Sequence, residues 1–117
     1  MSSSIVDHAA LLDRVDGDLE FLEETVELLE SDGRQLVEEL RSAAEAGDQD
    51  ALVKKAHAHK GMVSNFCAET VQREAEEIEY LARDGTLAEI PEKVGSFVSS
   101  FDLLCLETRA IASGGKP

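Results

Sequence analysis

The sequence has 117 residues, enough for one domain, and its 25 acidic and 11 basic side chains give a formal net charge of −14. Duplex DNA, RNA and membranes are therefore poor partners, because binding to them depends on clustered Lys and Arg or on long apolar runs. With no recognisable secretory signal and two isolated cysteines in no metal or CxxC pattern, we expect a cytoplasmic protein without a metal site.

The first half of the chain has the apolar spacing of helices. Asp7 can cap a short helix that runs to about Val15, and a longer helical stretch follows from Leu19 to a stop signal at Gly47. The inward residues expected in this stretch are Leu22, Val26, Leu29, Leu36, Leu40 and Ala43. Ser-Asp-Gly at 31–33 interrupts the stretch chemically but not in phase, which predicts either one kinked helix or two helices in line.

The second half continues with three further elements. A helix is predicted over about 49–66, a very short turn at 67–68, and another helix that ends at 84–85. Residues 86–89 have the spacing of a capping box, and Pro91 marks the start of the last helix or the end of a preliminary turn. The inward residues expected in these helices are Leu52, Ala56, His59, Val63, Phe66, Val71, Ala75, Ile78, Ala82, Ile90, Val94, Phe97, Phe101, Leu104, Thr108 and Ile111.

These elements predict an all-α fold. No segment alternates with a period of two residues and no Asn-Gly hairpin occurs, so strands are not expected. Four long amphipathic stretches with short connections favour an antiparallel four-helix bundle with an additional short N-terminal helix. We expect one domain over residues 7–112, with flexible ends at 1–6 and 113–117.

One segment of this acidic chain is basic, namely residues 54–61, Lys-Lys-Ala-His-Ala-His-Lys-Gly. A helix turns about 100° per residue, so His59 continues the apolar stripe and is expected to pack in the core. His57 lies about 200° away from His59 and faces another side of the helix. The residues that share the face of His57 are Lys54, Lys60, Gly61 and Ser64.

This face suits an imidazole that receives a phosphoryl group. A neutral ring nitrogen is a nucleophile, and Lys54 and Lys60 can stabilise charge on the transferring oxygens. The missing side chain of Gly61 leaves room for an incoming active site. Ordinary solvated surface has the same pattern, so the residues alone leave both interpretations open. A His-x-His metal site is not expected, because the two rings diverge on a helix.

Residues 56–61 resemble the A-H-x-L-K-G signature of histidine phosphotransfer (HPt) domains. The similarity continues through Asn-Phe-Cys-Ala at 65–68 and through the helix end at 79–85, and it spans the chain from about Asp7 to Ile111. Two positions depart from the family pattern. His59 stands where Leu is usual, and Cys67 stands where Gly is usual at the helix end.

The resemblance implies that the active His is exposed midway along one helix of a four-helix bundle. It identifies His57 as the residue that is phosphorylated, Lys60 as a phosphate contact and Gly61 as the access point for a partner. It also implies an orienting or hydrogen-bonding role for Glu79, which comes from the adjacent helix. Lys54 and Ser64 join this predicted site as phosphate-stabilising or access residues.

The function implied is that of a histidine phosphotransfer protein in a two-component phosphorelay. It accepts a phosphoryl group from the aspartate of a receiver domain and passes it to another receiver, so its expected partners are response-regulator receiver domains and a hybrid histidine kinase. We expect a phosphocarrier rather than an enzyme, with no cofactor of its own, because the receiver supplies Mg²⁺ and most catalytic groups. Two alternatives stay open, a docking module that carries no phosphate and the phosphotransfer domain of a chemotaxis-type kinase.

Overall fold

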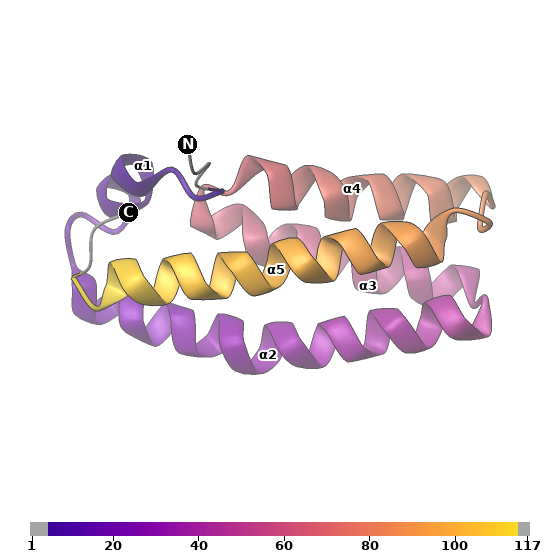
Figure 1. Ribbon diagram of the computed structural model, residues 1–117, viewed down its shortest axis with the longest axis horizontal. Helices are drawn as coiled ribbons and strands as arrows, with labels where there is room; N and C mark the ends of the chain where they lie inside the picture. The colour runs from indigo at the N-terminus through magenta and orange to yellow at the C-terminus, as the bar shows by residue number, and fades with distance from the viewer. Residues whose placement is uncertain (1–4, 115–117) are drawn as a thin grey trace.

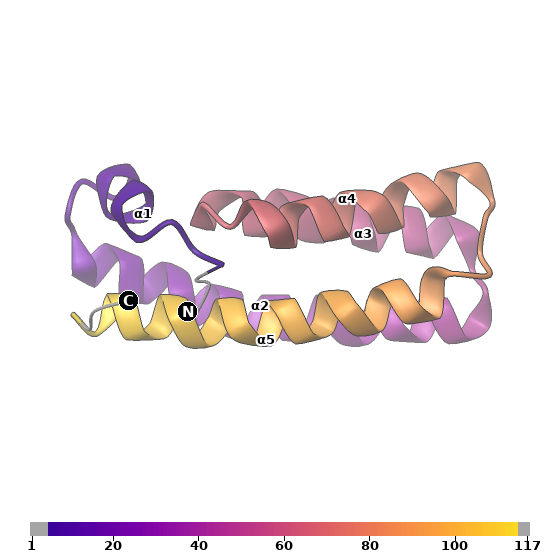
Figure 2. The ribbon, with the colours of Figure 1, turned by 45° about the horizontal axis from the view of Figure 1, so that its top comes forward.

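The computed structural model describes residues 5–114, which form an all-α bundle without strands in that range (Figure 1). The elements are α1 (His8–Arg14), α2 (Leu19–Ala46), α3 (Gln49–Val63), a 3₁₀ turn (Ser64–Phe66), α4 (Glu69–Asp84) and α5 (Ile90–Ala112). The four long helices run antiparallel to their neighbours in the chain, and α1 lies at one end of the bundle (Figures 1 and 2). The predicted four-helix bundle with an additional N-terminal helix is therefore confirmed.

α1, α2 and α3 are each preceded by an aspartate that caps the helix N-terminus. The carboxylates of Asp7, Asp18 and Asp48 each accept a hydrogen bond from a backbone N–H three residues further on, which satisfies a donor that the helix itself leaves unpaired. α2 and α4 end at Gly47 and Gly85, which adopt left-handed φ values of 63° and 78°. These abrupt ends allow the short connections that place successive helices side by side.

α2 is one continuous helix of 28 residues, so the Ser-Asp-Gly segment at 31–33 does not divide it. Gly33 is buried against α5, and a Cβ added there would lie 2.5 Å from Cζ of Phe101. The inward stripe passes through Gly33 and Val37, whereas Leu36 is only half-buried. The prediction of Leu36 as an inward residue is therefore wrong. The glycine lets the Phe101 ring approach the α2 backbone, and Val37, one turn later on the same face, is buried.

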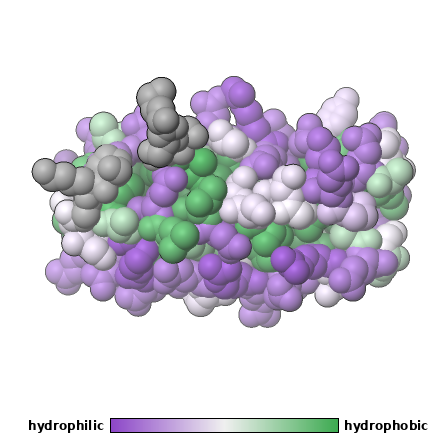
Figure 3. Space-filling model, in the orientation of Figure 1, coloured by the Kyte–Doolittle hydropathy of each residue, from purple (hydrophilic) through white to green (hydrophobic). Residues whose placement is uncertain are grey.

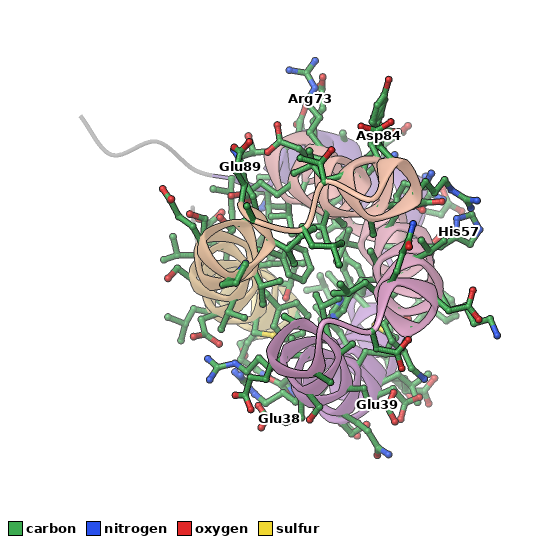
Figure 4. The ribbon with its side chains drawn as sticks, turned by 90° about the vertical axis from the view of Figure 1, so that its right-hand side faces the viewer. Glu38, Glu39, His57, Arg73, Asp84 and Glu89 are labelled. Atoms are coloured by element: carbon green, nitrogen blue, oxygen red, sulfur yellow. The ribbon has the colours of Figure 1, made fainter. Side chains whose placement is uncertain are left out.

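The core lies between the four long helices, which surround it when the bundle is viewed end-on (Figure 4). Every inward residue expected in α3, the 3₁₀ turn, α4 and α5 is buried, including His59 and Thr108. The Thr108 hydroxyl donates to the carbonyl oxygen of Leu104 at 2.7 Å, so this buried polar group is satisfied within its own helix. Helical periodicity therefore located the core correctly in this half of the chain.

The junction between α4 and α5 differs from the prediction. α5 begins at Ile90, and the Glu89 side chain makes no capping hydrogen bond. The Thr86 hydroxyl instead donates to the carboxylate of Asp84 at 2.8 Å. The predicted capping box is therefore wrong. The fixed φ of Pro91 suits the first turn of a helix, and this places the start of α5 too late for Thr86 to cap it.

The first described residues are packed against the bundle. The backbone N–H groups of Ile5 and Val6 donate to the carboxylate of Glu107 at 3.1 and 3.0 Å, and Val6 is buried. A carboxylate on α5 therefore contacts the backbone of two residues of the segment 1–6, whose flexibility stays a prediction. At the other end, the N–H of Ser113 donates to the carbonyl oxygen of Arg109. The remainder of the expected flexible ends, 1–4 and 115–117, lies outside the described residues.

The surface mixes hydrophilic side chains with scattered hydrophobic ones on the face that carries α5 (Figure 3). Leu103 and Leu106 of α5 are among the exposed hydrophobic side chains. Within residues 5–114, no helix combines the length and the apolar character that crossing a bilayer requires.

Candidate functional site

His57 and His59 occupy opposite environments on α3. The side chain of His57 is 64% exposed and points away from the bundle, as Figure 4 shows. His59 is fully buried, with its ring edge-to-face on Phe97 and Phe101 at centroid distances of 4.7 and 5.2 Å. The helical phase of the sequence predicted this division, which leaves His57 as the accessible imidazole of α3.

A buried carboxylate orients the His57 ring. Oε2 of Glu79, on α4, lies 3.1 Å from Nδ1 of His57. An ionised carboxylate can only accept a hydrogen bond, so Nδ1 of the neutral ring carries the proton and donates it. Nε2 therefore keeps the lone pair. This contact is the one that the orienting or hydrogen-bonding role predicted for Glu79 requires.

Two cations neutralise Glu79. The ammonium group of Lys60 lies 3.2 Å from Oε1. The guanidinium of Arg83 donates to Oε2 through Nη2 at 2.8 Å and Nε at 3.1 Å. Burial raises the pKa of the Glu79 carboxyl, but hydrogen bonds from Arg83, Lys60 and His57 outweigh burial and hold that pKa below its usual range. Glu79 is therefore an anion with three positively polarised neighbours.

The register of the α3–α4 hairpin brings these groups together. His57 and Glu79 each lie 11 residues from Ala68, at the turn between the two helices, and Lys60 and Glu76 each lie eight residues from it. The second pair also meets, with Nζ of Lys60 4.0 Å from Glu76. Cys67 makes the sharp turn in a left-handed conformation with φ of 55°, and its carbonyl oxygen accepts from the N–H of Asp7 at 3.0 Å.

Comparison with known proteins assigns this arrangement to a family. A model of the Hpt domain matches residues 9–112. The chain belongs to the Hpt domain family. The crystal structure of histidine-containing phosphotransfer protein B (HptB) from Pseudomonas aeruginosa PAO1 is similar over 98% of this chain and 100% of that one, with a TM-score of 0.80 and 25% identity. No curated protein matches the sequence.

Membership places the chain among the phosphocarrier modules of phosphorelays, which interact with receiver domains and histidine kinases. In this Hpt domain the other predicted site residues make local contacts. Lys54 pairs with Asp50 one turn earlier at 3.6 Å, and the Ser64 hydroxyl donates to the carbonyl oxygen of Gly61 at 2.7 Å. A Cβ added at Gly61 would meet nothing within 4 Å, so the fold itself does not require glycine there.

Arg83 is a residue of this site that was not predicted from the sequence. Its side chain is 61% exposed, and with Lys60, Glu79 and Tyr80 it lines an open depression on α4. The signal was present, because Glu79 and Arg83 are four residues apart on a predicted helix and side chains at that spacing meet. Among residues 5–114 no cluster of three or more His, Cys, Asp or Glu side chains is placed to hold a metal ion.

Proposed function

We propose that this Hpt domain carries a phosphoryl group on Nε2 of His57, accepts it from the aspartate of one receiver domain and passes it to another. The observation that carries this proposal is the exposed ring whose Nδ1 faces the buried carboxylate of Glu79. Two free cysteines, Cys67 and Cys105, are consistent with action in the cytoplasm, where thiols stay reduced.

Each bond that forms or breaks in the proposed transfer involves a named group of the ring or of the aspartyl phosphate. The Nε2 lone pair attacks the phosphorus of the aspartyl phosphate, the P–O bond to the carboxylate breaks, and the carboxylate leaves with the electron pair. The ring then holds a proton on Nδ1 and phosphorus on Nε2, and the positive charge it has gained faces Glu79. The ammonium of Lys60 can turn to the phosphoryl oxygens, while the receiver supplies most of the catalytic groups.

The direct test is to incubate the protein with each phosphorylated receiver domain of its source organism. We expect a receiver-dependent label that acid releases and alkali retains, as for phosphohistidine, and a ³¹P NMR signal coupled to Nε2 of His57. Label that survives acid would contradict the proposal. Binding to receivers without uptake of acid-labile phosphate from any of them would instead favour a docking module.

Gly61→Ala tests whether the gap beside His57 serves partner access. Alanine favours a helix over glycine by about 1 kcal/mol, and nothing lies within 4 Å of the added Cβ, so the free energy of unfolding should rise. The added methyl group obstructs the approach of a receiver, and about 1.4 kcal/mol of lost contact slows transfer about tenfold. Urea unfolding and the initial rate of label uptake measure the two effects.

Gly95→Ala is the matched control, because Gly95 is also an exposed helical glycine with nothing within 4 Å of an added Cβ. It lies on α5 and should stabilise the protein without changing transfer. An unchanged transfer rate in Gly61→Ala would show that a receiver does not approach α3 at this point.

A further inference from the structure

We infer that Arg83 is a positioning residue for phosphotransfer, which clamps Glu79 and so keeps the His57 ring in its singly protonated, nucleophilic form. This inference rests on the proposed role of His57. It assigns a function to an exposed arginine that lies outside the motif of α3 and makes no contact with the His57 ring among the described interactions.

The geometry joins the two side chains through one oxygen. Oε2 of Glu79 accepts from Nδ1 of His57 at 3.1 Å and from the Arg83 fork at 2.8 and 3.1 Å. Arg83 follows Glu79 by one turn of α4, and its side chain reaches the carboxylate from the solvent side. Any change in the charge of the Arg83 side chain is therefore felt at the oxygen that holds the His57 proton.

The sign of this effect follows from electrostatics. A carboxylate beside an imidazole favours the doubly protonated ring, which has no lone pair on Nε2 and cannot attack phosphorus. A cation that pairs with the same carboxylate weakens the attraction of that carboxylate for a second proton on the ring. The cation also repels that proton directly. Arg83 thus lets Glu79 orient the ring while it weakens the attraction of Glu79 for a second proton on that ring.

Lys60 cannot replace Arg83 throughout the reaction. Its single ammonium contacts Oε1 of Glu79 in the free protein, and in the proposed transfer it turns to the phosphoryl group. Asp84 of α4 lines the same depression, and its carboxylate accepts a hydrogen bond from the Thr86 hydroxyl. Glu76 lies 4.0 Å from Lys60, and the remaining pairs are Lys54 with Asp50 on α3 and Lys55 with Glu39 on the α2 side. Arg83 is then the cation that stays on Glu79.

The first experiment needs no partner protein. The ring ¹⁵N shifts of His57 are followed through a pH titration of the whole chain in wild type, Arg83→Gln and Arg83→Lys. Removing one nearby charge in a solvated site should raise the pH at which half of the His57 rings are doubly protonated by about 0.5. Arg83→Lys should restore the wild-type titration, because it restores the charge.

Arg73→Gln is the matched control. Arg73 is also an exposed arginine on α4 that pairs with a glutamate one turn away, Glu69, but this pair does not involve Glu79. The control should titrate like wild type. An Arg83→Gln titration that coincides with wild type would overturn the inference, as would an equal displacement in Arg73→Gln.

The second experiment measures phosphorylation by phosphoramidate, whose P–N bond breaks as Nε2 attacks and ammonia leaves. The ratio of wild-type to variant rates cancels the pH dependence of the donor. For Arg83→Gln we expect a ratio that grows as the pH falls, to about three at most, and that approaches one at alkaline pH, from the same displacement of about 0.5 pH unit. A ratio independent of pH would indicate a merely structural role and would overturn the inference.

Glu79 supplies the last check. In a Glu79→Gln background, the effect of Arg83→Gln on the rate should be clearly smaller than in the wild type, because the carboxylate that holds Arg83 beside the ring is gone. Additive effects would overturn the inference. If the proposed function is wrong, His57→Gln will still acquire label. If only this inference is wrong, labelling will require His57 but not Arg83.

Discussion

His57→Gln is expected to abolish phosphoryl uptake while the free energy of unfolding stays within about 0.5 kcal/mol of wild type. A glutamine amide has no lone pair that can attack phosphorus, so transfer should fall below detection rather than merely slow. Stability should hold because the His57 side chain is 64% exposed and its contact is with Glu79, to which a glutamine amide can also donate. Label uptake and urea unfolding on the same preparation separate the two outcomes.

The other histidine of α3 is the control for this experiment. His59 is sealed between Phe97 and Phe101, so His59→Leu should keep the wild-type extent of labelling. Label that persists on His57→Gln and disappears from His59→Leu would reverse the assignment of the phosphorylated residue.

The sequence predicted the fold well because most of its information is local. Aspartate caps and glycine stops mark helix ends chemically, and a period of 3.6 residues separates His57 from the core stripe of His59. The 3₁₀ turn over Ser64–Phe66 was predicted as the end of α3, and this changed no assignment of buried residues. The phase of a long amphipathic helix is robust to errors of a few residues at its ends.

The missed features depend on contacts between helices. Gly33 has the appearance of a helix break in the sequence, but it is buried because the Phe101 ring of α5 fills the space beside it. The role of Glu79 came from the family resemblance, since the register of the α3–α4 hairpin depends on where the turn at Cys67 falls. Arg83 was overlooked because an i,i+4 pair on a helix is usually ordinary surface, and only the position of His57 gives it a function.

His59→Leu is expected to raise the free energy of unfolding by about 2 kcal/mol at pH 7. Both ring nitrogens of His59 are buried without a hydrogen bond of normal geometry, and the ring has only a weaker interaction with the Gly33 backbone; each such group costs about 1–3 kcal/mol. The offset is that the edge-to-face contacts of the ring with Phe97 and Phe101 are lost, which are worth about 0.5–1.5 kcal/mol. Leucine fills a similar volume without polar atoms and is the residue that HPt domains usually have here.

The same substitution should flatten the acid dependence of stability. Burial lowers the pKa of His59 to about 4, although the interaction with the Gly33 backbone acts to raise it, whereas in the unfolded chain the ring has its ordinary pKa of 6.5. Between these two pH values the unfolded state binds more protons, so the stabilisation present above pH 6.5 is lost as pH falls towards 4. The loss approaches about 1.4 kcal/mol per pH unit and about 3 kcal/mol in all.

Carboxylates also titrate in this range, so the informative quantity is the difference between wild type and His59→Leu at each pH. That difference should grow steadily from pH 7 to pH 4.5 in urea unfolding experiments. His57→Gln is the control, because replacing an exposed histidine leaves the buried ring in place and should preserve the acid sensitivity that His59 causes. A constant difference would mean that His59 reaches solvent or finds a proton acceptor before the bundle unfolds. Its position two residues from His57 would then expose the proposed phosphorylation site to the same opening.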